Sequence, residues 1–193
     1  MSDEAKELVG SDIRLLDLYG YAFFDFADMA GANANGGYPY TPPIQILCGL
    51  RESVDMLLEE GLDCVFARHR RIAEGVRAAV KAWGLGLVAR SPELYSDTVS
   101  AIWVPEGFDS TVLTDHIYDT YGVSFGIGLG QMSGKAFRIG HLGSLTDVMT
   151  LSGLATVEMG MADLGYPVEL GSGVRAAQEH YRKSARPAIR TAA

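Results

Sequence analysis

The chain has 193 residues, of which 24 are acidic and 16 are basic, and its formal net charge is −8 at pH 7. This acidic balance argues against a nucleic-acid partner and against adhesion to an anionic membrane, because both would attract a basic face. No apolar run is long enough to span a bilayer, and the acidic first residues do not resemble an export signal. We therefore expect a cytoplasmic protein of one large domain, or a compact domain with a lead-in.

The cysteine and histidine patterns predict neither a metal site nor a disulfide. Cys48 and Cys64 have no metal or redox spacing, and we expect buried free thiols in a reducing compartment. The four histidines are scattered without ligand spacing. No nucleophile-elbow motif supports a Ser–His–Asp hydrolase.

The N-terminal third is predicted to contain a short helix over residues 3–9, an apolar and aromatic stretch over 13–26, and a loop over 30–37. The apolar stretch has no clean helical period and needs a covering surface. A longer helix is expected over 43–60, because its apolar residues recur at helical spacing and its prolines fit a first turn. Thr41 is a natural N-cap for this helix.

Helices and short strands alternate in the remainder of the chain. A helix is predicted over 63–83, where an apolar stripe is accompanied by basic residues that we expect to form a solvated face paired with nearby carboxylates. Gly153 and Gly160 predict close packing along a long and mostly buried helix. Strands are expected over 87–89, 98–104 and 123–127, and around Arg138. Three more helices are expected: one from Asp109 or Ser110 to 121, one from a Ser144–Asp147 capping box to about 164, and one over 173–184.

The strand around Arg138 is the first candidate for a functional site. Side chains alternate along a strand, so Phe137 and Ile139 share an apolar face, and Arg138 lies on the other face between Ala136 and Gly140. A planar guanidinium with open space in front of it can hold a carboxylate through two parallel hydrogen bonds. From the spacing alone, a strand arginine paired with a structural Asp or Glu is the commoner arrangement.

The glycine-rich segment 126–130 does not predict a nucleotide site. A dinucleotide fingerprint would need glycine in place of Gln131. A phosphate loop would need glycine in place of Leu129 and a hydroxyl in place of Ala136. We expect a flexible loop near the ligand.

Segment 137–143 (FRIGHLG) resembles the substrate-carboxylate strand of the class V pyridoxal-phosphate aminotransferases, in their serine–glyoxylate and alanine–glyoxylate branch. The resemblance implies that Arg138 binds the α-carboxylate of the substrate. It covers residues 1 to about 184, but only the C-terminal half of the family's enzyme.

Segments 38–42 (YPYTP) and 49–52 (GLRE) resemble a second region of the same family. This resemblance implies that Tyr38 and Thr41 reach across a dimer interface to the phosphate of pyridoxal 5'-phosphate held by the other subunit. Tyr40 is a weaker candidate. Segment 43–45 departs from the branch, which more often has small and polar residues there.

The fold class that the resemblance implies is α/β, the C-terminal domain of a fold-type I aminotransferase. This small α+β domain has a mostly antiparallel sheet covered on one side by helices, and a remnant of the large domain precedes it. The expected limits are 1–60 for the remnant with an interdomain helix, 61–184 for the small domain, and 185–193 for a disordered tail.

The chain contains four lysines, and none resembles the family's Schiff-base lysine; they are Lys6, Lys81, Lys135 and Lys183. We therefore expect no catalytic residue in this chain, and a cofactor shared with an N-terminal half or a full-length aminotransferase in a homo- or hetero-oligomer. The implied reaction transfers an amino group between a serine- or alanine-like amino acid and glyoxylate, and the chain alone would be inactive. Two alternatives stay open: a non-catalytic binding or regulatory subunit that docks on a full-length enzyme, and a degenerate product without function.

Overall fold

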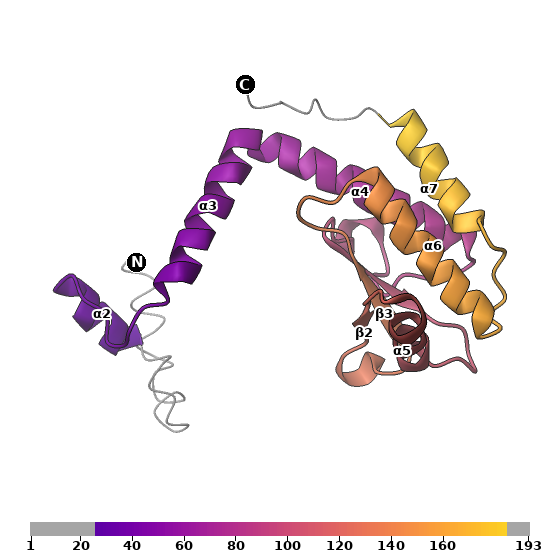
Figure 1. The fold of residues 1–193 in the computed structure, drawn as a ribbon, viewed down its shortest axis with the longest axis horizontal. Coiled ribbons are helices and arrows are strands. Elements are labelled where there is room, and N and C mark those ends of the chain that lie inside the picture. Colours follow the sequence, from indigo (N-terminus) through magenta and orange to yellow (C-terminus); the bar gives the residue numbers. More distant parts are fainter. Residues whose placement is uncertain (1–25, 185–193) are drawn as a thin grey trace. The chain divides into compact units, whose positions relative to one another are not determined.

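The computed structural model describes residues 26–184 and divides the chain into two compact units, 1–56 and 57–193 (Figure 1). The predicted short helix over 3–9 and nearly all of the apolar stretch over 13–26 lie outside the described residues, as does the predicted tail. The predicted domain limits at residues 60 and 61 stay a prediction.

Helix α2 (Phe26–Ala34) lies where the first half of a loop over 30–37 was expected, so this prediction is wrong. Alanines alternate through the segment, and alanine has the strongest helix propensity of all residues. The side-chain amides of Asn33 and Asn35 also donate to backbone carbonyls four residues earlier, at 2.7 and 3.2 Å. The chain leaves the helix at Gly36, where φ is +71°.

Helix α3 (Ile44–Glu60) begins later than expected, and its N-cap is not Thr41. The carbonyl of Pro43 accepts the backbone N–H of Leu47 at 3.0 Å, which places Pro43 at the N-cap position. None of the residues of α3 is buried, although its apolar residues keep helical spacing. The exposed apolar residues are Ile44, Ile46, Leu47, Leu50, Val54, Met56, Leu57 and Leu58.

A three-stranded antiparallel sheet forms the base of the second unit, in the order β1-β3-β2. Its strands are β1 (Val99–Trp103), β2 (Gly126–Ile127) and β3 (Ala136–Gly140). The expected strand over 87–89 is reduced to one bridge between Leu87 and Ile102, and β2 is shorter than the predicted 123–127.

Four helices lie on one side of this sheet: α4 (Leu62–Ala82), α5 (Ser110–Tyr121), α6 (Asp147–Asp163) and, as an outer helix, α7 (Ser172–Lys183). Ile102, Phe137 and Ile139 point from the sheet into a single core cluster, which all four helices share. Helix α4 contacts β1, α5 contacts β2 and β3, and α7 packs on α4 and α6. The expected antiparallel sheet with helices on one side is therefore confirmed.

The helix caps confirm one prediction and correct another. The carboxylate of Asp109 accepts the N–H of Thr111 at 2.7 Å and caps α5. The cap of α6 is Thr146, whose hydroxyl accepts the N–H of Met149, so the predicted capping box at Ser144 is wrong. The helix begins at Asp147 instead, where a bidentate ion pair with the buried Arg71 of α4 holds its first turn.

Glu158 is a buried carboxylate in α6 that holds the start of α7. It accepts hydrogen bonds from the indole N–H of Trp83 at 2.8 Å and from the backbone N–H groups of Gly171, Gly173 and Val174 at 2.7, 2.6 and 3.2 Å. Three N–H groups at the start of a helix have no intrahelical partner, so a carboxylate placed there satisfies them. In the sequence, this role is marked only by an isolated charge in an apolar helix.

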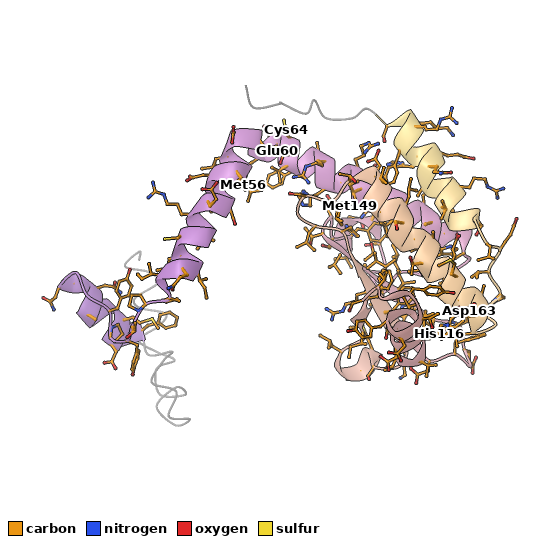
Figure 2. All side chains as sticks on the ribbon, viewed as in Figure 1. Met56, Glu60, Cys64, His116, Met149 and Asp163 are labelled. Carbon is orange, nitrogen blue, oxygen red and sulfur yellow. The ribbon has the colours of Figure 1, made fainter. Side chains whose placement is uncertain are left out.

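Two surface features complete the description of the side chains (Figure 2). His116 of α5 and Tyr121 both bind the carboxylate of Asp163 in α6, at 2.9 and 2.7 Å, and these hydrogen bonds lower the pKa of Asp163. Cys48 and Cys64 are free thiols, but both are exposed, which corrects the expectation that they are buried.

One of the two glycines predicted to allow close packing does so. A Cβ on Gly160 would overlap the side chain of Ile117 in α5, whereas a Cβ on Gly153 would have no atom within 4 Å.

We expect Gly160→Ala to lower the free energy of unfolding by about 1–3 kcal/mol through overpacking. Gly153→Ala should raise it by up to about 1 kcal/mol, because alanine favours the helix. Urea unfolding of both variants tests the pair, and equal effects would contradict it.

Candidate functional site

Arg138 lies at the centre of the sheet face that the helices leave open. Its cross-strand partners are Ala101 in β1 and Gly126 in β2, and its neighbours two residues away on β3 are Ala136 and Gly140. The guanidinium therefore stands in a frame of four residues with little or no side chain. We call this surface the Arg138 face, formed by Val99, Ala101 and Trp103 of β1, Gly126 of β2, and Ala136, Arg138 and Gly140 of β3.

The predicted alternation of the β3 side chains is confirmed. Phe137 and Ile139 are buried under the helices, and Arg138 is half-buried on the opposite face. It is the only charged residue in the sequences of the three strands. Its position thus follows from burying the apolar residues on either side of it.

The guanidinium of Arg138 is anchored by one of its three nitrogens. The Nε–H donates to the backbone carbonyl of Ile127 at 3.0 Å. Among residues 26–184, no carboxylate forms an ion pair with Arg138, and no hydrogen bond engages Nη1 or Nη2. The commoner arrangement, a structural ion pair, is therefore not found within the described part of the chain. Both NH2 groups are left, and one N–H of each lies parallel to the other, an arrangement that suits a carboxylate.

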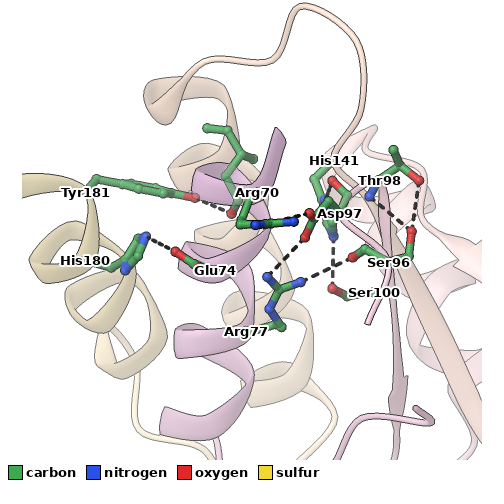
Figure 3. Close-up of polar contacts among 11 residues, drawn as sticks. Arg70, Glu74, Arg77, Ser96, Asp97, Thr98, Ser100, His141, His180 and Tyr181 are labelled. Atoms are coloured by element: carbon green, nitrogen blue, oxygen red, sulfur yellow. Dashed lines mark hydrogen bonds and ion pairs between the residues drawn. The ribbon is translucent and has the colours of Figure 1, made fainter. Parts of the chain in front are cut away.

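His141 fixes the end of β3, three residues after Arg138 (Figure 3). Its ring is 1 % exposed; Nδ1 lies 3.2 Å from the carbonyl oxygen of Asp97, and Nε2 lies 2.9 Å from the hydroxyl of Ser100. A carbonyl can only accept, so Nδ1 carries a proton, and in the neutral ring Nε2 accepts from Ser100. Burial lowers the pKa of His141, which favours this neutral form.

Two arginines of α4 hold the segment to which His141 binds (Figure 3). The carboxylate of Asp97 accepts from Arg70 Nε at 3.1 Å and from Arg77 Nη2 at 3.3 Å. Arg77 Nη1 donates to the carbonyl of Ser96 at 3.2 Å. Helix α4, segment 96–98 and the end of β3 are thus joined by one polar network.

The turn after β3 is also bound to α4. Gly143, with φ of +79°, donates its N–H to His69 Nε2 at 3.1 Å and accepts from Arg68 Nη1 at 2.5 Å. Arg68 also makes two hydrogen bonds of 2.7 Å to Glu60, and these lower the pKa of Glu60. The basic residues of α4, predicted to form a solvated face paired with carboxylates, do pair with carboxylates but also bind backbone groups of the turns around β3.

Tyr38 and Thr41 lie in the first unit, between α2 and α3, whereas Arg138 lies in the second. Both side chains are exposed, and Tyr38 is 57 % exposed. Their segment contains three prolines, which have no N–H to offer an anion, so side-chain hydroxyls supply a large share of the donors there. Two hydroxyls three residues apart fit a phosphate in the type of donor they supply. The role of these residues stays a prediction.

The described part of the chain offers no enclosed lysine for a Schiff base. Lys81, Lys135 and Lys183 are exposed, and Lys6 lies outside the described residues. Within residues 26–184, no three His, Cys, Asp or Glu side chains gather as a metal site. No helix in that range is long and apolar enough to cross a membrane.

The turns that anchor β3 generate a prediction about pH. Because the folded state keeps His141 neutral while an unfolded histidine has a pKa of about 6.5, the unfolded state binds more protons below that pH. The free energy of unfolding should therefore fall as the pH is lowered through about 6.5. His141→Gln, which retains a donor and an acceptor, should weaken this dependence in urea unfolding at a series of pH values. An unchanged slope in the variant would contradict the assignment.

Comparison with known proteins places this geometry in a family. No family model matches the chain. The chain is 63 % identical over 171 residues to an L-aspartate–glyoxylate aminotransferase of Paracoccus denitrificans, covering 89 % of this chain and 43 % of that protein. It is 56 % identical over 163 residues to a serine–glyoxylate aminotransferase of Hyphomicrobium methylovorum, covering 84 % and 40 %. The chain thus spans about two fifths of the length of the curated relatives it matches.

Solved structures give the same result. The pyridoxamine–pyruvate aminotransferase of Mesorhizobium loti superposes with a TM-score of 0.72 at 34 % identity, covering 77 % of this chain and 38 % of that one. The alanine–glyoxylate aminotransferase of a Nostoc species superposes with a TM-score of 0.59 at 25 % identity, covering 64 % and 33 %. These neighbours have the fold-type I architecture. The chain belongs to the class V aminotransferases and corresponds to a C-terminal part of such an enzyme, as the sequence resemblance predicted.

Proposed function

We propose that this chain supplies the carboxylate-binding part of an aminotransferase that moves an amino group between an amino acid and glyoxylate. The relatives are named for glyoxylate with serine or aspartate, so the amino donor is an amino acid of this kind. The observation that carries the proposal is the Arg138 guanidinium, whose two NH2 groups have no protein partner among the described residues, inside a frame of small residues.

The residues of this chain bind and orient the substrate. Arg138 neutralises the α-carboxylate and fixes its plane through Nη1 and Nη2, which sets the direction of the bond from the carboxylate to the α-carbon. The His141 network and the α4 contacts to Gly143 keep β3 in place while the substrate binds. Orientation of this kind contributes to the rate because the entropic cost of aligning the reacting atoms is met when the substrate binds.

Pyridoxal 5'-phosphate, the cofactor that the family implies, would act as the electron sink for the α-carbon. Tyr38 and Thr41 would donate their hydroxyls to its phosphate, in a site completed by another subunit. The lysine of the reaction would come from another chain or from the missing N-terminal half, because the lysines within the described residues are exposed. The chain is then inactive alone, and its partner is an N-terminal half or a full-length aminotransferase in a cytoplasmic homo- or hetero-oligomer.

Helix α3 supports the need for a partner. Eight of its apolar residues are exposed and none of its residues is buried, whereas single exposed hydrophobics on a surface are ordinary. An apolar helix of this kind is stable when another surface covers it. The second candidate, a binding or regulatory subunit that docks on a full-length aminotransferase, would use the same helix and the same Arg138 site without adding turnover.

Reconstitution tests the proposal. The chain is combined with the part of the Paracoccus relative that precedes the matched region, and transamination of glyoxylate is measured with serine and with aspartate. We expect turnover from the mixture only, and no borohydride-reducible adduct of the chain alone with pyridoxal phosphate. A stoichiometric adduct on one lysine of this chain would overturn the requirement for another chain.

Substitution of Arg138 tests the site within the same assay. Arg138→Met should lower kcat/KM by about a hundredfold or more, because two charge-assisted hydrogen bonds are lost. Arg182→Met serves as the matched control, since Arg182 is an exposed arginine of α7, and it should leave kcat/KM unchanged. A complex that binds tightly but gains no turnover would favour the regulatory candidate instead.

A further inference from the structure

The side chain of Arg138 lies over Gly126, its cross-strand partner in β2. A Cβ built on Gly126 would lie 3.0 Å from Arg138 Nε, 3.1 Å from Arg138 Cβ and 3.4 Å from Arg138 Cζ. Gly126 is not among the glycines with positive φ, so its backbone conformation is open to other residues. Glycine is therefore needed at this position for the space it leaves to the arginine, and not for its own backbone.

The next residue fixes the arginine in that space. The carbonyl of Ile127 accepts the Nε–H of Arg138 at 3.0 Å, which leaves Nη1 and Nη2 at the far end of the guanidinium. A carboxylate could approach an arginine along its side, through Nε and one Nη, or end-on through both Nη groups. The side approach would have to break the bond to Ile127, so the end-on approach is favoured.

The segment after Ile127 holds that carbonyl in place. A Cβ on Gly128 would overlap the backbone oxygens of Met132 and Ala136, so this backbone runs directly against the start of β3. The short helical turn at Gly130–Met132 follows immediately. The glycine-rich segment, which lacks the spacing of a nucleotide-binding motif, thus has a structural use, since each of its first two glycines allows a close approach to β3.

We propose that Gly126 is a positioning residue of the carboxylate site: it seats the Arg138 side chain against β2, with Nε on the Ile127 carbonyl, so that the substrate carboxylate is bound end-on by Nη1 and Nη2. This inference rests on the proposed function, because it assumes that Arg138 binds the substrate. A Cβ at position 126 requires the Arg138 side chain to give by a few tenths of an ångström, which disturbs its bond to Ile127 and moves Nη1 and Nη2 from the position that favours the end-on approach.

Gly126→Ala in the reconstituted enzyme is the main test, with Gly153→Ala as the matched control, because a Cβ at Gly153 meets no atom within 4 Å. We expect Gly126→Ala to raise KM for glyoxylate and for the amino acid by about tenfold to a hundredfold, with a smaller change in kcat. Gly153→Ala should leave KM and kcat unchanged. An unchanged KM in Gly126→Ala would overturn the inference.

The NMR signal of the Arg138 Nε–H group, identified by its loss in Arg138→Met, supplies a second measurement. A general loss of stability does not change this signal in the folded protein. In Gly126→Ala this signal should shift and exchange faster with water, because the bond to Ile127 is disturbed. A signal identical to that of the wild type would also overturn the inference. If Arg138→Met leaves kcat/KM unchanged, the proposed function fails, which is a distinct result.

A double variant covers the case in which Gly126→Ala folds poorly. If Gly126 acts through Arg138, the alanine should cost less stability in an Arg138→Ala background, since Nε and Cζ, two of the three Arg138 atoms that it meets, are gone and only Cβ remains. The same loss in both backgrounds would show that Gly126 serves the fold alone, and the inference would be wrong.

Discussion

The structure of the second unit depends on the burial of Phe137 and Ile139 in the middle strand of a three-stranded sheet. Because the side chains of a strand alternate, burying these two residues places Arg138 on the opposite face of the sheet. A shift of one residue in the register would bury a guanidinium and expose two large apolar side chains. The hydrophobic core therefore decides the position of the functional group, and no separate interaction has to hold Arg138 on its face.

Helix α4 joins this core to the site. Its apolar side packs into the core, and its basic side binds the connections at the ends of the strands: Asp97 through Arg70 and Arg77, and Gly143 through Arg68 and His69. Many of these bonds end on backbone carbonyls or on partly exposed carboxylates, so each contributes modestly to stability. Together they restrict the segment before β1 and the turn after β3, which lie at the same end of the sheet.

Local patterns in the sequence predicted the elements and the Arg138 face, because alternation, helical spacing and the Asp109 cap depend on neighbours in the chain. The loop expected over 30–37 failed for a local reason, since alanine propensity outweighed the turn signals of glycine and asparagine. Ser144 failed as a cap because the turn after β3 is held by α4, and the helix begins only at Asp147, opposite Arg71. This pairing joins residues far apart in the sequence.

The roles of Gly126 and Glu158 could not be predicted for the same reason. A glycine beside a strand has many explanations until the arginine across the sheet is seen over it. An isolated glutamate in an apolar helix gives no sign that the start of a later helix will donate to it. Sites built from residues close in sequence can be recognised from the sequence, whereas contacts between distant segments require the structure.

The carboxylate of Glu158 has a consequence for the cooperativity of the fold. Its partners belong to the end of α4 and the start of α7, while Glu158 itself lies in α6. Detaching α7 would leave a charge in the core without the donors that compensate its desolvation, and such an opening is costly. We therefore expect local fluctuations of α7 to be suppressed, and the amide hydrogens of α4, α6 and α7 to exchange with solvent in one concerted opening.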